Sequence, residues 1–228
     1  MKKIVFAAAL GLGLLASNPG HAVLITGVND DFTIDWFLGA GQSDNDGGPT
    51  SSIDLSATGT FDVAEFTGAY VKLNVTVENT TVLSGAVTEA GITSFGMGTN
   101  PDATSVTFSD DPDGAFVDAE IQTGQQTFPA GFKQIDVCVF TQGCNGGSQG
   151  GALAAGASDS FMLTIFGDFS GGSVILEPFP IKFQTTEDSF GFGGSVKVSE
   201  PGSLVLLAVG LLVLGLVGRR RPAMLRAA

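Results

Sequence analysis

Apolar and polar residues alternate along four stretches in the middle of the chain. Within each stretch the apolar residues recur at every second position, so they would lie on one face of an extended strand. These residues are Ile53, Leu55, Ala57, Phe61 and Val63; Val71, Leu73, Val75 and Val77; Ile135, Val137 and Val139; and Phe161, Leu163 and Ile165. A period of two with a single apolar face predicts half-buried antiparallel strands.

The segments between these stretches are rich in Gly, Asn, Asp, Pro and Ser, as at positions 43–52, 98–104 and 109–115. Such residues permit or fix the backbone geometry of turns. We therefore expect about ten short strands in an all-β domain, a single antiparallel β-sandwich with a jelly-roll-like arrangement. Most of the 18 phenylalanines should pack between its sheets, and we expect Trp36 and Tyr70 at a sheet edge.

Charge is divided unevenly along the chain. All 23 acidic residues lie between positions 23 and 200, together with only four of the ten basic residues. A segment this acidic repels phosphate backbones, so we expect no nucleic-acid partner.

The N-terminus has the pattern of a secretory signal peptide. Lys2 and Lys3 precede an apolar run at positions 4–16, which is short for a membrane span. Small residues at Gly20 and Ala22 match the positions that a signal peptidase reads. We expect residues 1–22 to be removed after Ala22; the alternative is a buried N-terminal helix.

The C-terminus combines an apolar stretch with a basic end. Residues 201–218 carry no charge, and as a helix they would extend roughly 27 Å, close to the thickness of a bilayer core. We expect a transmembrane helix at 203–218 and a basic tail at 219–228. Arg219, Arg220 and Arg221 would then stay in the cytoplasm. The alternative is a plain tail anchor.

A short motif, Val198-Ser199-Glu200-Pro201-Gly202, stands directly before this helix. Proline disfavours helix at the preceding residue, so Glu200 should be extended at the membrane surface. Motif, helix and arginines together (198–228) resemble the PEP-CTERM sorting signal, in which Ser199 replaces the usual first proline. The resemblance implies processing by an exosortase-type membrane enzyme in a Gram-negative bacterium that makes exopolysaccharide.

A second resemblance covers the C-terminal half of the domain. Cys144 is followed by a glycine-rich run, then by Ala-Gly-Ala-Ser-Asp-Ser-Phe leading into a strand, and Ile181-Lys182-Phe183-Gln184 comes later. This order is similar to that of the cistern family of PEP-CTERM proteins. We expect the glycine-rich part of the segment 144–169 to form a surface loop before a strand, because glycines cost backbone entropy and bury little.

The predicted export determines what we expect of the two cysteines, Cys138 and Cys144. An oxidising compartment favours a disulfide, and the intervening residues leave room for a turn. A metal site is the alternative, although two thiols without histidine form a poor zinc site. We expect the disulfide.

Catalytic chemistry has few candidates in the mature domain, 23–197. The single histidine, His21, lies in the segment that cleavage removes, which excludes Ser-His-Asp and Cys-His mechanisms. Aspartates at 44–46 and 110–113 could offer oxygen ligands to calcium, but neither loop has EF-hand spacing. We expect no metal, no cofactor and no enzyme activity.

The sequence therefore predicts an exported, non-enzymatic protein of the cell surface or extracellular matrix. Before processing, the C-terminal helix would anchor it in the cytoplasmic membrane. The family resemblance implies a structural or adhesive role in an exopolysaccharide biofilm. Two alternatives remain: a carbohydrate-binding module, and a glycoside hydrolase that uses paired carboxylates.

Overall fold

The protein is an all-β chain with one turn of 3₁₀ helix among the residues that the structure, a computed structural model, describes: 22–110, 113–122 and 128–197. The strands are β1 (Val23–Ile25), β2 (Phe32–Leu38), β3 (Leu55–Phe66), β4 (Tyr70–Asn79), β5 (Ala90–Met97), β6 (Thr99–Asn100), β7 (Ala103–Asp110), β8 (Asp118–Ile121), β9 (Val137–Phe140), β10 (Leu153–Ala154), β11 (Ser158–Gly167), β12 (Val174–Leu176), β13 (Pro180–Thr185) and β14 (Ser189–Lys197). The 3₁₀ turn is η1 (Gln149–Gly151). The predicted all-β class is confirmed.

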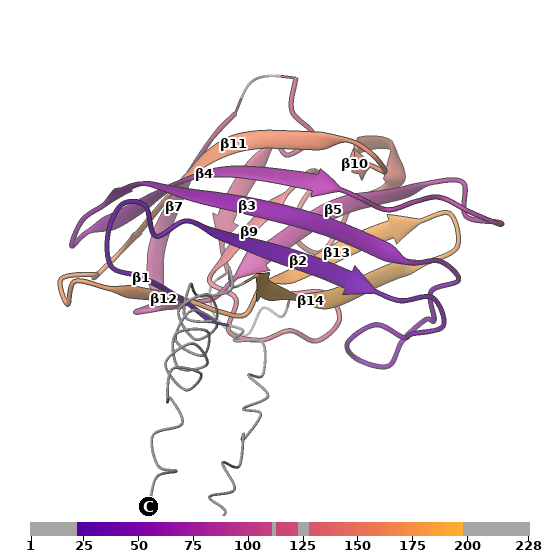
Figure 1. The fold of residues 1–228 in the computed structure, drawn as a ribbon, viewed down its shortest axis with the longest axis horizontal. Helices are drawn as coiled ribbons and strands as arrows, with labels where there is room; N and C mark the ends of the chain where they lie inside the picture. The colour runs from indigo at the N-terminus through magenta and orange to yellow at the C-terminus, as the bar shows by residue number, and fades with distance from the viewer. Residues whose placement is uncertain (1–21, 111–112, 123–127, 198–228) are drawn as a thin grey trace, which may run out of the picture.

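Most of the strands belong to one antiparallel sheet that nearly closes on itself (Figure 1). Its order is β7-β11-β4-β3-β2-β14-β13-β5-β9-β8, and β10 pairs with β5 beside this path. The two edge strands, β7 and β8, lie next to each other without pairing. A separate three-stranded sheet has the order β1-β12-β6.

The predicted alternation is confirmed by burial. In β4, buried and outward-facing residues alternate strictly, and the buried ones include Val71, Leu73, Val75 and Val77. In β9, Cys138 is buried as well as Val137 and Val139, so this strand does not alternate. In β3 and β11 the predicted apolar residues are buried between less buried neighbours. Antiparallel strands with one solvated face produce this pattern because successive side chains point to opposite faces.

β14 is the strand at which the sheet turns from one layer to the other. Its first half pairs with β13, from Ser189 to Gly193, and its second half pairs with β2, from Gly194 to Lys197. A Cβ at Gly194 would lie 2.4 Å from Ile34 Cγ2 and 2.6 Å from Trp36 Nε1. The strand can therefore turn here only because this position has no side chain.

Trp36 lies at the centre of the core beneath this turn. Its side chain is 1 % exposed, and its indole N–H donates a 2.9 Å hydrogen bond to the Phe179 carbonyl. The same carbonyl accepts a 2.7 Å bond from the backbone N–H of Gly194. The prediction of a sheet-edge position for Trp36 is wrong, because β2 lies between β3 and β14. Tyr70 lies at the start of β4, where its ring packs on Phe166.

Phenylalanines fill the space between the layers, as predicted. Phe61 stacks on Phe32 with ring centroids 4.6 Å apart, and Phe95 meets Phe116 edge to face at 5.5 Å. Offset and edge-to-face aromatic pairs add to the hydrophobic gain from burial. The core is therefore a continuous aromatic and aliphatic layer that joins both halves of the sheet.

The two ends of the described domain meet at one end of the strands. Lys197, the last residue of β14, pairs with Thr33 at the start of β2, and a short segment, 26–31, joins β1 to β2. We call the opposite end, where β2 ends and β14 begins, the distal end. The predicted signal peptide, apart from Ala22 at its boundary, the sorting motif and the C-terminal helix lie outside the described residues. Within the described ranges there is no helix that is long and apolar enough to cross a membrane.

A substitution at Gly59 tests how tightly the side chains pack around Trp36. A Cβ at this position would lie 2.7 Å from two ring atoms of Trp36 and 2.9 Å from Phe61 Cε2. We expect Gly59→Ala to lower the free energy of unfolding by about 1–3 kcal/mol through overpacking, measured by urea unfolding followed by circular dichroism. Gly27→Ala is the matched control, because no atom lies within 4 Å of its added methyl group. Equal stability of the two variants would contradict this account of the core.

Candidate functional site

The outer face of β5 and β9 is covered by loops and carries a second apolar cluster. Its buried members are Phe128, Ile135, Cys138 and Cys144, against which Phe132 and Phe140 pack. Because the main core lies on the other side, every residue of β5 is buried. The loops lie this close because Gly96 has no side chain: a Cβ there would be 2.7 Å from Ile135 Cγ2.

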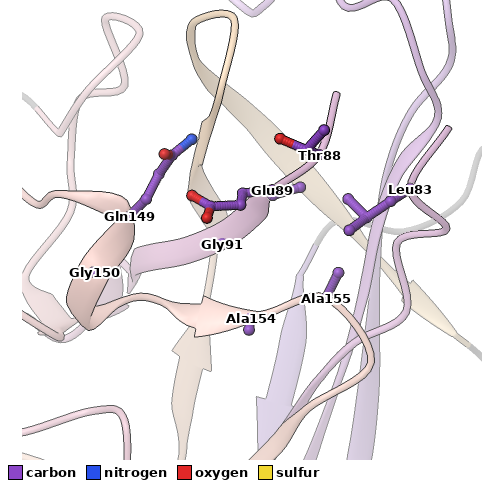
Figure 2. Close-up of a pocket in the computed structure, with 9 residues that line it drawn as sticks. Leu83, Thr88, Glu89, Gly91, Gln149, Gly150, Ala154 and Ala155 are labelled. Carbon is purple, nitrogen blue, oxygen red and sulfur yellow. The ribbon is translucent and has the colours of Figure 1, made fainter. Parts of the chain in front are cut away.

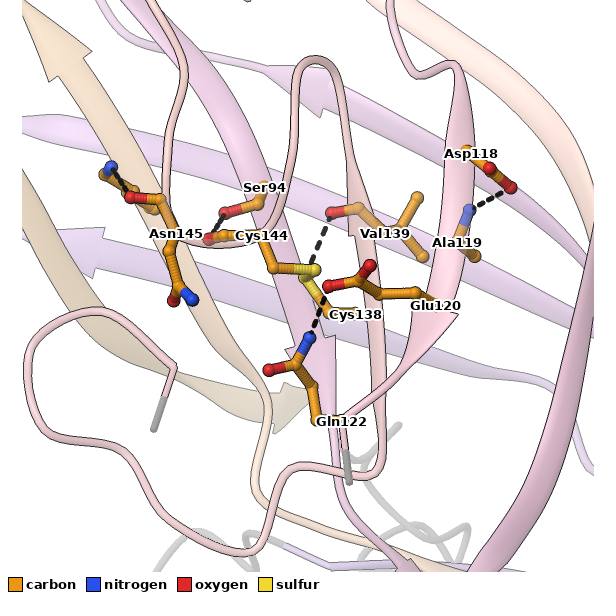
Figure 3. The surroundings of a disulfide bond; sticks show 10 residues. Ser94, Asp118, Ala119, Glu120, Gln122, Cys138, Val139, Cys144 and Asn145 are labelled. Atoms are coloured by element: carbon orange, nitrogen blue, oxygen red, sulfur yellow. Dashed lines mark hydrogen bonds between the residues drawn. A yellow bond between two sulfur atoms is a disulfide. The ribbon is translucent and has the colours of Figure 1, made fainter. Parts of the chain in front are cut away.

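The predicted disulfide between Cys138 and Cys144 is confirmed (Figure 3). The two Cα atoms are 6.0 Å apart, within the usual range for a disulfide. The bond joins β9 to the start of the glycine-rich loop, and Ser94 on β5 donates a 3.2 Å hydrogen bond to the Cys144 carbonyl. The loop is thus attached to the sheet by both a covalent and a hydrogen bond.

Lys182 on β13 is a buried cation beneath this loop. It is 8 % exposed, and its Nζ donates a 3.3 Å hydrogen bond to the Asn145 carbonyl. Burial lowers the pKa of the Lys182 amine below its usual value, because the charged form loses hydration. Nothing in the sequence pattern distinguishes this lysine from an exposed one, since the loop that covers it comes from a distant segment.

A cavity of about 270 Å³ opens at the distal end, and we call it the distal cavity (Figure 2). It lies between the start of β5, η1 and β10, and the loop that joins β4 to β5. The residues that line it are Leu83, Thr88, Glu89, Ala90, Gly91, Gln149, Gly150, Ala154 and Ala155. The cavity combines one carboxylate, one amide and one hydroxyl group with small or aliphatic walls.

Asn79 fixes the two walls of the distal cavity to each other. Its side chain is fully buried, and its Nδ2 donates hydrogen bonds of 3.0 Å to the Ala90 carbonyl and 2.9 Å to the Leu153 carbonyl. Gly91 permits the close approach of the walls, because a Cβ there would lie 2.5 Å from the Cβ of Ala152. The cavity is therefore built into the frame of the domain.

A second cavity, of about 350 Å³, lies away from the distal end, and we call it the acidic cavity. It is lined by Thr99, Asn100, Asp102, Gln134, Asp136 and Glu177. Burial raises the pKa of the Asp136 carboxyl and the nearby Asp102 raises it further, although hydrogen bonds from Thr99 lower it. Those bonds run from the Thr99 backbone N–H and side-chain hydroxyl to Asp136 Oδ2, at 2.5 and 3.2 Å.

The outward face of β2, β3, β4 and β11 is rich in hydroxyl groups. Thr33, Thr60, Thr76 and Ser160 are successive cross-strand partners. The hydroxyls of Thr76 and Ser160 are 2.8 Å apart. Such hydroxyl groups favour hydration of this face, on which Phe37 and Met162 are also exposed.

The acidic loops that the sequence analysis weighed as calcium ligands do not gather into a metal site within the described residues. Asp44 accepts a 2.6 Å hydrogen bond from the backbone N–H of Gly48, which closes its own turn. Burial raises the pKa of the Asp44 carboxyl, and Asp46 adds to this effect. The described parts of the chain contain no group of three or more His, Cys, Asp or Glu side chains arranged to hold a metal ion.

Comparison with known proteins adds no relative. No family model, no curated protein and no solved structure matches the chain.

The disulfide should contribute measurably to stability. Closing so short a loop is worth about 2 kcal/mol in the chain-entropy model, so we expect Cys138→Ser with Cys144→Ser to lower the free energy of unfolding by that amount. Urea unfolding of the double variant measures the loss. Ser94→Ala, which removes only the hydrogen bond to the Cys144 carbonyl, should cost less. Unchanged stability of the double variant would contradict the structural role.

Lys182 should give the domain a pH-dependent stability. Because the folded pKa is lowered, the unfolded chain binds more protons at pH values between the folded and the unfolded pKa of this amine. Stability should therefore rise with pH through that alkaline window. Lys182→Met should remove this contribution, as seen in urea unfolding at several pH values. The exposed Lys133→Met is the control and should leave the rise intact; an identical pH profile for wild type and Lys182→Met would count against the buried cation.

Proposed function

We propose that this chain is an exported protein that an exosortase-type membrane enzyme processes at its C-terminus. It is delivered to the cell surface or extracellular matrix of a Gram-negative bacterium, after transient anchoring by its C-terminal helix. There it has a structural or adhesive, non-enzymatic role in an exopolysaccharide biofilm. In this proposal the nearly closed sheet is a β-sandwich with a jelly-roll-like arrangement.

The main support for this proposal is that both ends of the described domain lie at the same end of the strands. Strand β1 begins directly after Ala22, and β14 ends directly before Val198. A membrane anchor attached at this end of the domain would hold it with its distal end directed outward. The disulfide supports the same conclusion, because disulfides persist in oxidising compartments outside the cytoplasm.

Burial of β1 constrains the order of processing. Val23 is 7 % exposed and pairs with Leu176, and Ile25 is fully buried. A peptidase needs an extended, accessible chain around its cleavage site, so removal of residues 1–22 would precede the docking of β1 on β12. This order fits a chain that is translocated unfolded and folds afterwards.

The acidic cavity is the observation that favours a second candidate, a glycoside hydrolase. A carboxyl group with a raised pKa beside other carboxylates is the arrangement that such enzymes use for acid catalysis. However, Asp136 Oδ2 already accepts both hydrogen bonds from Thr99, and none of the described residues that line the cavity is aromatic, as a sugar site would favour. We therefore favour the non-enzymatic role.

The intact mass of the protein from its native cells tests the sorting proposal. We expect an N-terminus at Val23 and a C-terminus within residues 198–202, and a longer chain in cells that lack the exosortase-type enzyme. Glu200→Ala should also retain the tail, because it removes the acidic residue of the motif. Ala223→Ser, in the basic tail, is the control that should leave processing unchanged. A mass that includes Arg219 to Ala228 in every strain would indicate a plain membrane anchor and sink the proposal.

A further inference from the structure

The loop that follows the disulfide contains the one asparagine of the chain that precedes a glycine, Asn145 before Gly146. Both residues are exposed to solvent, and Asn145 lies directly after Cys144 (Figure 3). Neither the Asn145 side chain nor the Gly146 backbone N–H forms a hydrogen bond with a described residue. The two groups can therefore react with each other, because glycine has no side chain that would obstruct the approach of its nitrogen to the side-chain amide.

Lys182 contacts the peptide group that joins these two residues. Its Nζ donates a 3.3 Å hydrogen bond to the Asn145 carbonyl oxygen, and no described carboxylate forms an ion pair with it. This carbonyl and the Gly146 N–H belong to one peptide group, in which the electrons are delocalised over oxygen, carbon and nitrogen. When the N–H loses its proton, the negative charge is therefore shared with the oxygen beside the ammonium group. A charged donor at that oxygen stabilises the anion.

We propose that Asn145 is a site of spontaneous deamidation, which Lys182 accelerates and directs toward isoaspartate. In the first step the Gly146 nitrogen gives its proton to water and attacks the side-chain carbonyl carbon of Asn145, Cγ. The bond from Cγ to the side-chain nitrogen breaks, and that nitrogen takes up a proton and leaves as ammonia. A succinimide ring that joins the two residues remains. Lys182 lowers the barrier to this step because it stabilises the deprotonated peptide group.

Water then opens the ring at one of its two carbonyl carbons. Attack at Cγ gives aspartate. Attack at the backbone carbonyl carbon breaks its bond to the Gly146 nitrogen, which takes up a proton, and gives isoaspartate, in which the chain continues through Cγ. Lys182 polarises only the backbone carbonyl and therefore favours isoaspartate. The new α-carboxylate keeps the oxygen atom that Lys182 already binds, so the buried ammonium gains a counter-ion without moving.

Asn45 gives an internal comparison, because it is equally exposed but lacks these features. Its side-chain Nδ2 donates a 2.9 Å hydrogen bond to the Ala130 carbonyl, and its own neighbour is Asp46, whose side chain obstructs attack by the backbone nitrogen. The Asn45 side chain is therefore held in place, and we expect it to convert much more slowly than Asn145. The inference does not depend on the proposed function, since it needs only the folded domain and water.

Incubation of the full-length protein in detergent at neutral pH tests the proposal. Samples are digested with pepsin at acidic pH, and mass spectrometry with electron-transfer fragmentation measures asparagine, aspartate and isoaspartate at position 145. We expect Lys182→Met to slow the conversion about tenfold, since it removes a charged hydrogen bond, and to raise the share of aspartate. Lys182→Arg keeps a cation and should restore the share of isoaspartate. The exposed Lys133→Met is the matched control and should behave as the wild type does. Circular dichroism verifies that each variant is folded.

A second variant tests the reaction without changing Lys182. Gly146→Ala should suppress the conversion, and the fold should tolerate it, because no atom lies within 4 Å of the added methyl group and Gly146 has no positive φ.

The chain unfolded in guanidinium is the reference, because Lys182 lies 37 residues from Asn145 and contacts it only in the folded domain. In this reference the wild type and Lys182→Met should convert at the same rate and to the same products. The incubation lasts until the unfolded chain has converted, and the inference is overturned if the folded wild type still has an intact Asn145 at that time. Equal rates and equal product shares for folded wild type and Lys182→Met would also overturn it. So would a cross-link between residues 145 and 182, because the amine would then have attacked the ring in place of water.

Discussion

The turn of β14 from one layer to the other is the constraint on which the rest of the structure depends. The Phe179 carbonyl, directly before β13, accepts hydrogen bonds from both the Trp36 indole and the Gly194 backbone, so a single acceptor ties β2 and β14 together where the sheet folds over. Glycine at 59 and 194 leaves the space that the indole ring occupies. Strands that change layers through such bends form the corners of folded sheets. Without this corner the two layers could not enclose a common core.

The main core covers one face of β5, and loops form a second layer on its other face. Because β5 is buried on both sides, its outer face needs a cover, which the loops on either side of β9 provide. The disulfide and Ser94 attach one of these loops to the sheet, and Asn79 holds the strand that follows it. The covering loop in turn carries Gln149, so the wall of the distal cavity follows from how the sheet is closed. The contacts that stabilise the domain therefore also form the wall of the distal cavity.

The domain is also polarised along its strands. Both ends of the described domain lie at one end of the strands, while the distal cavity, with its small aliphatic walls and its carboxylate, lies at the other. Between them extends a hydroxyl-rich face that favours hydration. This arrangement suits a domain that is held at one end and meets its surroundings at the other.

The sequence by itself determined the elements that depend on neighbouring residues. Alternation predicted β3, β4 and β11 as half-buried strands, and it located β9, whose outer face loops cover. Two cysteines behind a predicted signal peptide predicted their pairing. Tertiary structure decided what depends on distant segments. β5 does not alternate because loops cover its outer face, and Trp36 is central because β14 turns over it. Lys182 is buried, and Gln149 and Glu89 line the same cavity, only through the closure of the sheet. A local pattern reports which face of a strand is apolar, but the partners of that face are chosen by the folding of the whole chain.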